Sequence, residues 1–94
     1  MYLSSYTYTG DPADLARRFD TILANYRDEL ILHVCVTTET GLLVLDACPD
    51  KATAEAFWAN PDFQAAQAAA GLPAPVISGL GDVHFAMANQ SVPV

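Results

Sequence analysis

Two apolar runs at the centre of the chain most constrain its fold. Residues 31–38 read ILHVCVTT and residues 41–48 read GLLVLDAC. Such β-branched, apolar runs are typical of strands, and Glu39, Thr40 and Gly41 between them suit a tight turn. We therefore predict a β-hairpin here, with a helical pattern on each side of it.

The segment before the hairpin predicts a strand and then a helix. Residues 2–9 alternate, so that Tyr2, Ser4, Tyr6 and Tyr8 share one face of the strand.

The helix that follows has a clear start. Asp11 suits the N-cap, Pro12 fits the first helical position, and Asp14 lies in the first turn. Apolar residues then recur at helical spacing over about five turns: Leu15, Phe19, Ile22, Leu23, Tyr26 and Leu30.

A second helical stretch follows the hairpin. Pro49 and Asp50 open it, and Asn60-Pro61-Asp62 suits a fresh cap at which the helix bends or restarts. We expect Asn60 to act as a cap and not as a ligand contact. Gly71 is a natural stop for this stretch.

The last strand is harder to place. We expect it within residues 76–88 and favour residues 82–88, with Gly79-Leu80-Gly81 as a turn. The tail, residues 89–94, is expected to be loose or to reach onto a partner.

The resulting order is β-α-β-β-α-β, which is the pattern of ferredoxin-like folds. The expected class is α+β, with a four-stranded antiparallel sheet and two helices on one face. Because the chain has 94 residues, we expect residues 1–94 to form one domain.

Charge narrows the possible partners. The net charge is −7, and the bases are Arg17, Arg18, Arg27 and Lys51. Nucleic acids and anionic membranes are bound through clusters of basic residues, so neither is an expected partner. A neutral apolar or aromatic ligand suits the chain better. The first ten residues lack the basic residue and the following apolar run of a signal peptide. We therefore expect a cytoplasmic protein with reduced thiols.

The face of the sheet away from the helices is expected to be apolar. In the hairpin, Leu32, Val34 and Val36 share one face with a matching set from the next strand. About five large apolar groups at roughly 1.5–3 kcal/mol each amount to roughly 10 kcal/mol. We therefore expect a homodimer that pairs through the sheet. The alternative is a monomer whose tail folds over this face.

His33, His84 and Asp46 are the candidate catalytic residues. Either histidine could act as a base near neutral pH, with Asp46 orienting it. Alternatively, the histidines are core residues satisfied by hydrogen bonds, and Asp46 caps the next helix or joins a polar network. The three lack the spacing of known metal sites, so we expect no metal, and no cofactor is expected either.

Whether His33 meets Asp46 depends on the hairpin register. A two-residue turn at Thr40-Gly41 places Cys35 opposite Asp46, and His33 opposite Cys48. A three-residue loop moves Asp46 to the other face, because a slip of one residue inverts a strand.

Aromatic residues suggest a pocket between helices and sheet. Phe57, Trp58 and Phe63 cluster around the break in the second helical stretch, and Tyr6 lies on the first strand. These four are the candidate ligand-binding residues, although core packing explains most of them equally well. Cys35 and Cys48 are expected to be buried apolar residues and not nucleophiles.

Several stretches carry a resemblance to a known superfamily: His33-Val34, residues 43–46, residues 70–75 and Val83-His84. With the strand order and length, they resemble the dimeric α/β-barrel superfamily. Within it, the chain is similar to small antibiotic-biosynthesis-monooxygenase-like proteins. The resemblance implies the fold and the dimer. Its functions include cofactor-free oxygenases, isomerases and haem-degrading enzymes.

The chain departs from the catalytic sets of these relatives. Cofactor-free oxygenases share an Asn, a Trp and an Arg or His around the cavity. Trp58 matches the Trp, but the first strand has no Asn and no Arg follows Arg27. The second helical stretch has no histidine for haem iron, only Gln64 and Gln67. We therefore expect a ligand-binding dimer first. The alternatives are a cofactor-independent monooxygenase or isomerase for an aromatic or polyketide-like substrate, and an interaction module with a closed core.

Overall fold

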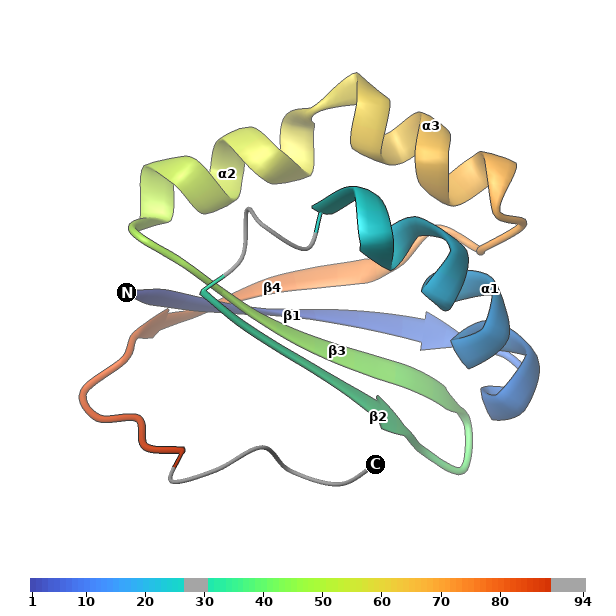
Figure 1. Ribbon diagram of the computed structural model, residues 1–94, viewed down its shortest axis with the longest axis horizontal. Helices are drawn as coiled ribbons and strands as arrows, with labels where there is room; N and C mark the ends of the chain where they lie inside the picture. Colours follow the sequence, from blue (N-terminus) through green and yellow to red (C-terminus); the bar gives the residue numbers. More distant parts are fainter. Residues whose placement is uncertain (27–30, 89–94) are drawn as a thin grey trace.

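The structure is a computed structural model that describes residues 1–26 and 31–88. Its elements are β1 (Tyr2–Thr9), α1 (Pro12–Tyr26), β2 (Leu32–Thr37), β3 (Gly41–Cys48), α2 (Lys51–Ala59), α3 (Pro61–Ala69) and β4 (Val76–Asp82). The strands form a four-stranded antiparallel sheet in the order β2-β3-β1-β4. All three helices lie over one face of this sheet (Figure 1). The fold is α+β and is compatible with a ferredoxin-like fold. The expectations for Arg27, Leu30 and the tail 89–94 lie outside the described residues.

Strand β1 crosses the middle of the sheet between β3 and β4. Its even-numbered residues, Tyr2, Ser4, Tyr6 and Tyr8, are all buried, and its odd-numbered residues are half-buried or exposed. The predicted alternation is confirmed. The three tyrosine side chains face the helices and form part of the hydrophobic core.

Short polar caps set the limits of the helices. The Asp11 carboxylate accepts a hydrogen bond from the Asp14 N–H at 2.9 Å, and the Asp50 carboxylate accepts one from the Thr53 N–H at 2.7 Å. The Asn60 side chain accepts a hydrogen bond from the Asp62 N–H at 2.9 Å. Since Pro61 follows Asn60 at the first position of α3, the predicted restart is confirmed as a break between two helices. This break gives three helices where two were expected.

Strand β4 lies earlier in the chain than the sequence favoured. It spans Val76–Asp82, whereas residues 82–88 were the favoured strand. Gly79-Leu80-Gly81, expected to be a turn, lies within the strand, where the register with β1 shifts. A Cβ added at Gly79 would lie 2.2 Å from the Tyr2 hydroxyl and 3.2 Å from the Trp58 ring. The missing side chain therefore lets Tyr2 and Trp58 pack over the strand, which the apolar pattern does not reveal.

The core fills the space between the helices and the inner face of the sheet. Its largest fully buried side chains are Tyr6, Tyr8, Leu42 and Val44. Leu15, Phe19 and Ile22 of α1 and Phe63 of α3 pack with them. The predicted apolar face of the first helix is therefore the face that docks.

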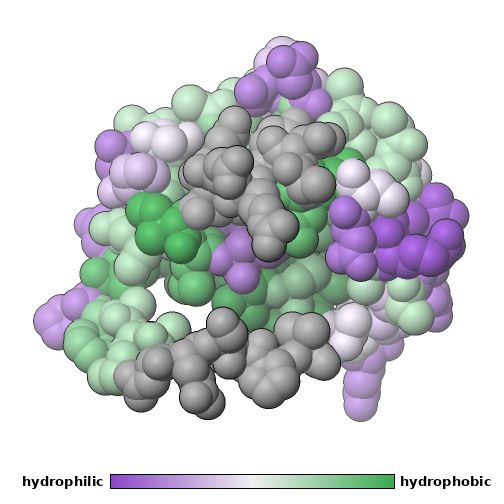
Figure 2. All heavy atoms as spheres, in the orientation of Figure 1, coloured by the Kyte–Doolittle hydropathy of each residue, from purple (hydrophilic) through white to green (hydrophobic). Residues whose placement is uncertain are grey.

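The outer face of the sheet is aliphatic and open. Leu32, Val34 and Val36 of β2 are each 39% exposed, and Val76 and Leu80 of β4 are more exposed still. Figure 2 shows apolar surface below the helices, over β2 and β3. No helix in the described part of the chain covers this face (Figure 1).

Candidate functional site

The register of the β2–β3 hairpin brings His33 and Asp46 together. The Thr38 N–H donates a hydrogen bond to the Gly41 carbonyl at 2.9 Å, so the turn residues are Glu39 and Thr40. His33 then pairs directly with Asp46. Neither of the two expected registers occurs. The observed turn begins one residue earlier than the expected two-residue turn. This moves the partner of His33 by two positions, from Cys48 to Asp46, so the two side chains lie directly opposite each other on the same face.

His33, which is half-buried, pairs with the buried Asp46. The Nδ1 atom of His33 contacts the Oδ1 atom of Asp46. Asp46 is only 4% exposed, so this contact supplies the partner that a buried carboxylate needs. The Phe19 ring stacks on the imidazole with centroids 5.6 Å apart and an angle of 10° between the planes. The imidazole is thus fixed from two sides.

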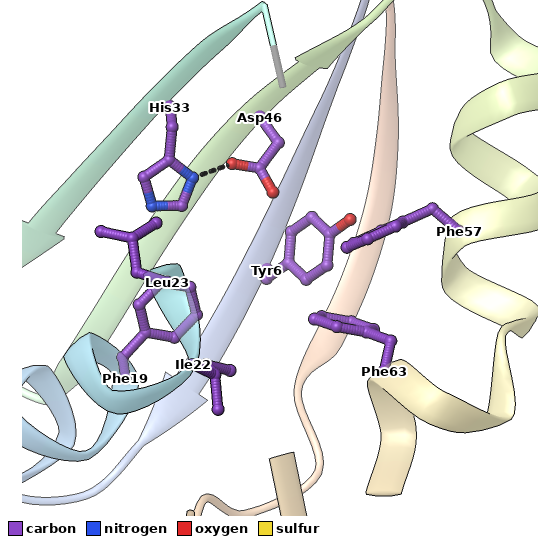
Figure 3. A pocket seen from close by; sticks show the side chains of 8 residues that line it. All are labelled: Tyr6, Phe19, Ile22, Leu23, His33, Asp46, Phe57 and Phe63. Atoms are coloured by element: carbon purple, nitrogen blue, oxygen red, sulfur yellow. Dashed lines mark hydrogen bonds and ion pairs between the residues drawn. The ribbon is translucent and has the colours of Figure 1, made fainter. Parts of the chain in front are cut away.

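The second ring nitrogen of His33 is left unpaired by the part of the chain that the structure describes. Its Nε2 atom is buried and makes no hydrogen bond within the described residues. It points away from Asp46, on the side where Leu23 lies (Figure 3). When Nδ1 carries the proton and donates to Asp46, Nε2 presents a lone pair. The arrangement therefore offers either an acceptor for a ligand or a base for a proton.

A small cavity lies beside this pair, and we call it the inner cavity. Its lining residues come from the sheet and from all three helices: Tyr6, Phe19, Ile22, Leu23, His33, Asp46, Phe57 and Phe63. The rings of Phe57 and Phe63 lie 4.4 Å apart, and Tyr6 meets Phe63 edge-on at 6.0 Å. The volume is about 10 Å³, which is room for roughly one water molecule.

Tyr6 lines the inner cavity, and its phenol is neutral. Burial raises the pKa of Tyr6 well above its usual value, and the nearby negative charge of Asp46 raises it further. The phenol is therefore protonated at neutral pH. The cavity presents aromatic and aliphatic side chains and the His33–Asp46 pair.

His84 lies apart from this site. It follows β4 in an exposed segment without regular structure. The structure thus brings together two of the three candidate catalytic residues, His33 and Asp46, and leaves His84 outside. Asp46 does not cap the next helix, because Asp50 does so.

Trp58 also lies apart from the other candidate ligand-binding residues. Tyr6, Phe57 and Phe63 line the inner cavity, whereas Trp58 lines a second hollow between α2, α3 and β4. We call this hollow the outer groove. It has a volume of about 340 Å³ and is lined by Trp58, Gln64, Gln67, Ala68, Leu72, Pro73, Ala74, Pro75 and Ile77.

Gln67 is the residue of the outer groove that sequence reasoning missed. It is only 6% exposed, and its Oε1 atom accepts a hydrogen bond from the Tyr8 hydroxyl at 2.5 Å. One signal was present in the sequence. Gln67 lies four positions after Phe63, and such residues share a helix face.

The two cysteines are poor nucleophiles in this environment. Burial raises the pKa of the Cys48 thiol, and the charges of Asp46 and Asp50 add to the effect. At the edge strand, partial desolvation raises the pKa of Cys35 to about 11, with smaller contributions from Asp20 and Asp46. Both thiols are therefore protonated at neutral pH. Cys48 is buried as expected, whereas Cys35 is exposed, contrary to expectation, because β2 is an edge strand.

Among residues 1–26 and 31–88, no cluster of three or more His, Cys, Asp or Glu side chains is placed to hold a metal ion. None of the described helices has the length and apolar character needed to cross a membrane.

Comparisons of the chain with protein-family models, with curated proteins and with solved structures give no match. The geometry of the site is therefore the basis on which we infer the function.

Proposed function

We propose that this protein binds a neutral apolar or aromatic small molecule in the inner cavity, with His33 as its polar contact. The observation that carries this proposal is the buried Nε2 atom of His33, which has no hydrogen-bond partner among the described residues. A buried polar atom without a partner is costly, and a ligand hydroxyl could donate a hydrogen bond to it. The aromatic and aliphatic lining supports an uncharged ligand, and the net charge of −7 disfavours an anion.

Binding requires the inner cavity to open. A volume of about 10 Å³ is far below the ~300 Å³ or more typical of small-molecule pockets. Leu23 and Phe57 are only partly buried at its boundary, so their side chains are the ones we expect to move. The ligand would then fill the space that these two side chains leave.

The same proposal includes a second copy of the chain on the outer face of the sheet. This pairing would give a dimeric α/β barrel, as in the superfamily that the chain resembles. The aliphatic side chains of β2 support it, since Leu32, Val34 and Val36 lie exposed on one face of an edge strand. Large contiguous apolar surfaces of this kind usually mark an interface.

A second candidate function is cofactor-independent proton chemistry on an aromatic or polyketide-like substrate. In this case Nε2 of His33 removes a proton from a substrate C–H or O–H group, and Asp46 stabilises the imidazolium that forms. Return of the proton to a different carbon gives an isomerase. Alternatively, the substrate carbanion reacts with dioxygen to give a hydroperoxide at that carbon, and loss of water from it leaves a carbonyl group. One oxygen atom then remains in the product and the other leaves as water, which is a monooxygenase reaction. The fixed His33–Asp46 pair is the observation that favours this candidate.

The two histidines allow a matched test. A panel of quinols, anthrones and small lactones is titrated against the wild type, His33→Gln and His84→Gln. We expect His33→Gln to weaken the binding of hydroxylated members about fivefold, which is the usual contribution of one hydrogen bond. His84→Gln, which changes an exposed residue outside the cavity, should bind like the wild type.

The same panel separates binding from catalysis. Binding without turnover supports the ligand-binding protein. Turnover by the wild type that falls about a hundredfold or more in His33→Gln supports the second candidate function, in which His33 is the base. Equal affinities and equal rates in both variants would remove His33 from either function.

A further inference from the structure

We propose that the outer groove is a second ligand site, one that takes a planar, uncharged compound carrying a carbonyl group. This inference goes beyond the proposed function, because no residue lines both the inner cavity and the outer groove. With a volume of about 340 Å³, the groove lies in the range of small-molecule pockets, roughly 300–1,000 Å³.

Gln67 determines the polar chemistry of the groove. Its Oε1 atom is occupied by the Tyr8 hydroxyl at 2.5 Å, which fixes the orientation of the amide. The Nε2 atom makes no hydrogen bond within residues 1–26 and 31–88, and it is not one of the fully buried atoms without a partner. It is therefore accessible to solvent at the groove, where an acceptor on the ligand can replace water as its hydrogen-bond partner.

Gln64 lines the same groove but is not available in the same way. It is exposed, and its Nε2 atom already donates to the Trp58 carbonyl at 3.3 Å. The Nε1 atom of Trp58 also lacks a partner among the described residues, but it is fully buried. We therefore expect one accessible polar anchor, at Gln67. This difference makes Gln64 a matched control for Gln67.

The other residues that line the groove favour a ligand whose main part is apolar and uncharged. The indole of Trp58 provides an aromatic wall, and Leu72, Pro73 and Ile77 are apolar. None of the residues that line the groove carries a charge. A buried ionic group would find no partner here, whereas a planar ring can pack against the indole.

The test uses indanone and indane, which differ in a single carbonyl group. Because the chain has one tryptophan, the indole N–H signal in ¹⁵N NMR reports on Trp58 alone. We expect indanone to bind about fivefold more tightly than indane. It should shift the Trp58 indole signal and the Gln67 side-chain amide signals, and indane should shift the Trp58 signal only.

Two variants complete the test. Gln67→Met keeps the length of the side chain and removes the amide, so the preference for indanone over indane should disappear. Gln64→Met makes the same change on the same groove and should preserve the preference. The shift of the Gln67 amide signals on binding indanone is measured in the wild type. The proposal can therefore be tested even if Gln67→Met fails to fold.

Three results would overturn the proposal: equal affinity for the two probes, no shift at the Gln67 amide with indanone, or shifts confined to residues of the inner cavity. The first two mean that Gln67 is only a core partner of Tyr8. The third assigns the probes to the inner cavity, and it leaves the function proposed for that cavity standing.

Discussion

The two faces of the sheet differ in a way that their exposure alone would not suggest. The inner face is buried and yet carries most of the polar chemistry, with Tyr8 bonded to Gln67 and His33 paired with Asp46. The outer face is open and yet its β2 side chains are aliphatic. A wet face of an antiparallel sheet normally carries polar side chains. The inner face thus gathers specific polar contacts, whereas the outer face leaves aliphatic side chains exposed.

The largest expected effect concerns the inner face. Leu42 is 1% exposed and lies in the core, so Leu42→Ala should lower the free energy of unfolding by about 2–5 kcal/mol. Val34→Ala, on the outer face, should cost less than about 1 kcal/mol in the monomer, because Val34 is already 39% exposed there. Urea denaturation at low protein concentration measures both. Similar losses for the two variants would contradict the difference between the faces.

The next effect concerns the outer face and tests the proposed dimer. Val34→Asp places a charge where the second copy would pack, so the dimer should weaken by at least about 2 kcal/mol per copy. Light scattering at micromolar concentration should show a dimer for the wild type that is insensitive to moderate salt, and a monomer for the variant. Thr7→Asp is the control, since Thr7 is already polar and exposed on the same face. A monomeric wild type would remove the proposed partner.

The smallest effect concerns the tyrosines of the inner face at alkaline pH. Burial raises the pKa of both Tyr6 and Tyr8 above the ordinary value of 10.0, and the charge of Asp46 raises both further. In the unfolded chain these phenols lose their protons as the pH passes about 10, whereas in the folded chain they keep them. The stability that they contribute is complete below that pH and is lost as the pH rises above it.

Urea denaturation at about pH 8 and about pH 11 measures this loss. Tyr8→Phe should have a shallower decline than the wild type, although it also gives up the hydrogen bond to Gln67. An identical decline in wild type, Tyr6→Phe and Tyr8→Phe would show that other groups cause it.

The sequence was sufficient to predict most residues of the candidate site, but not how they are arranged in space. His33, Asp46, Tyr6, Phe57 and Phe63 were all candidates, and they line one cavity. The sequence pattern could not show which aromatic residues line the inner cavity and which line the outer groove. Trp58 directly follows Phe57 in α2, yet it faces the outer groove, because adjacent residues on a helix point in different directions.

The sequence by itself determined the features that depend on neighbouring residues. Asp11, Asp50 and Asn60 cap their helices by bonding backbone N–H groups two or three residues away, so local spacing is sufficient to find them. The alternation of β1 is equally local.

The tertiary structure alone decided the contacts between distant residues. The hairpin register placed His33 opposite Asp46, and pairing with β1 placed β4 at Val76–Asp82. A slip of one residue in a strand costs little in local preference, but it moves every side chain to the other face. Only packing against the rest of the molecule, such as Tyr2 and Trp58 over Gly79, selects among such registers.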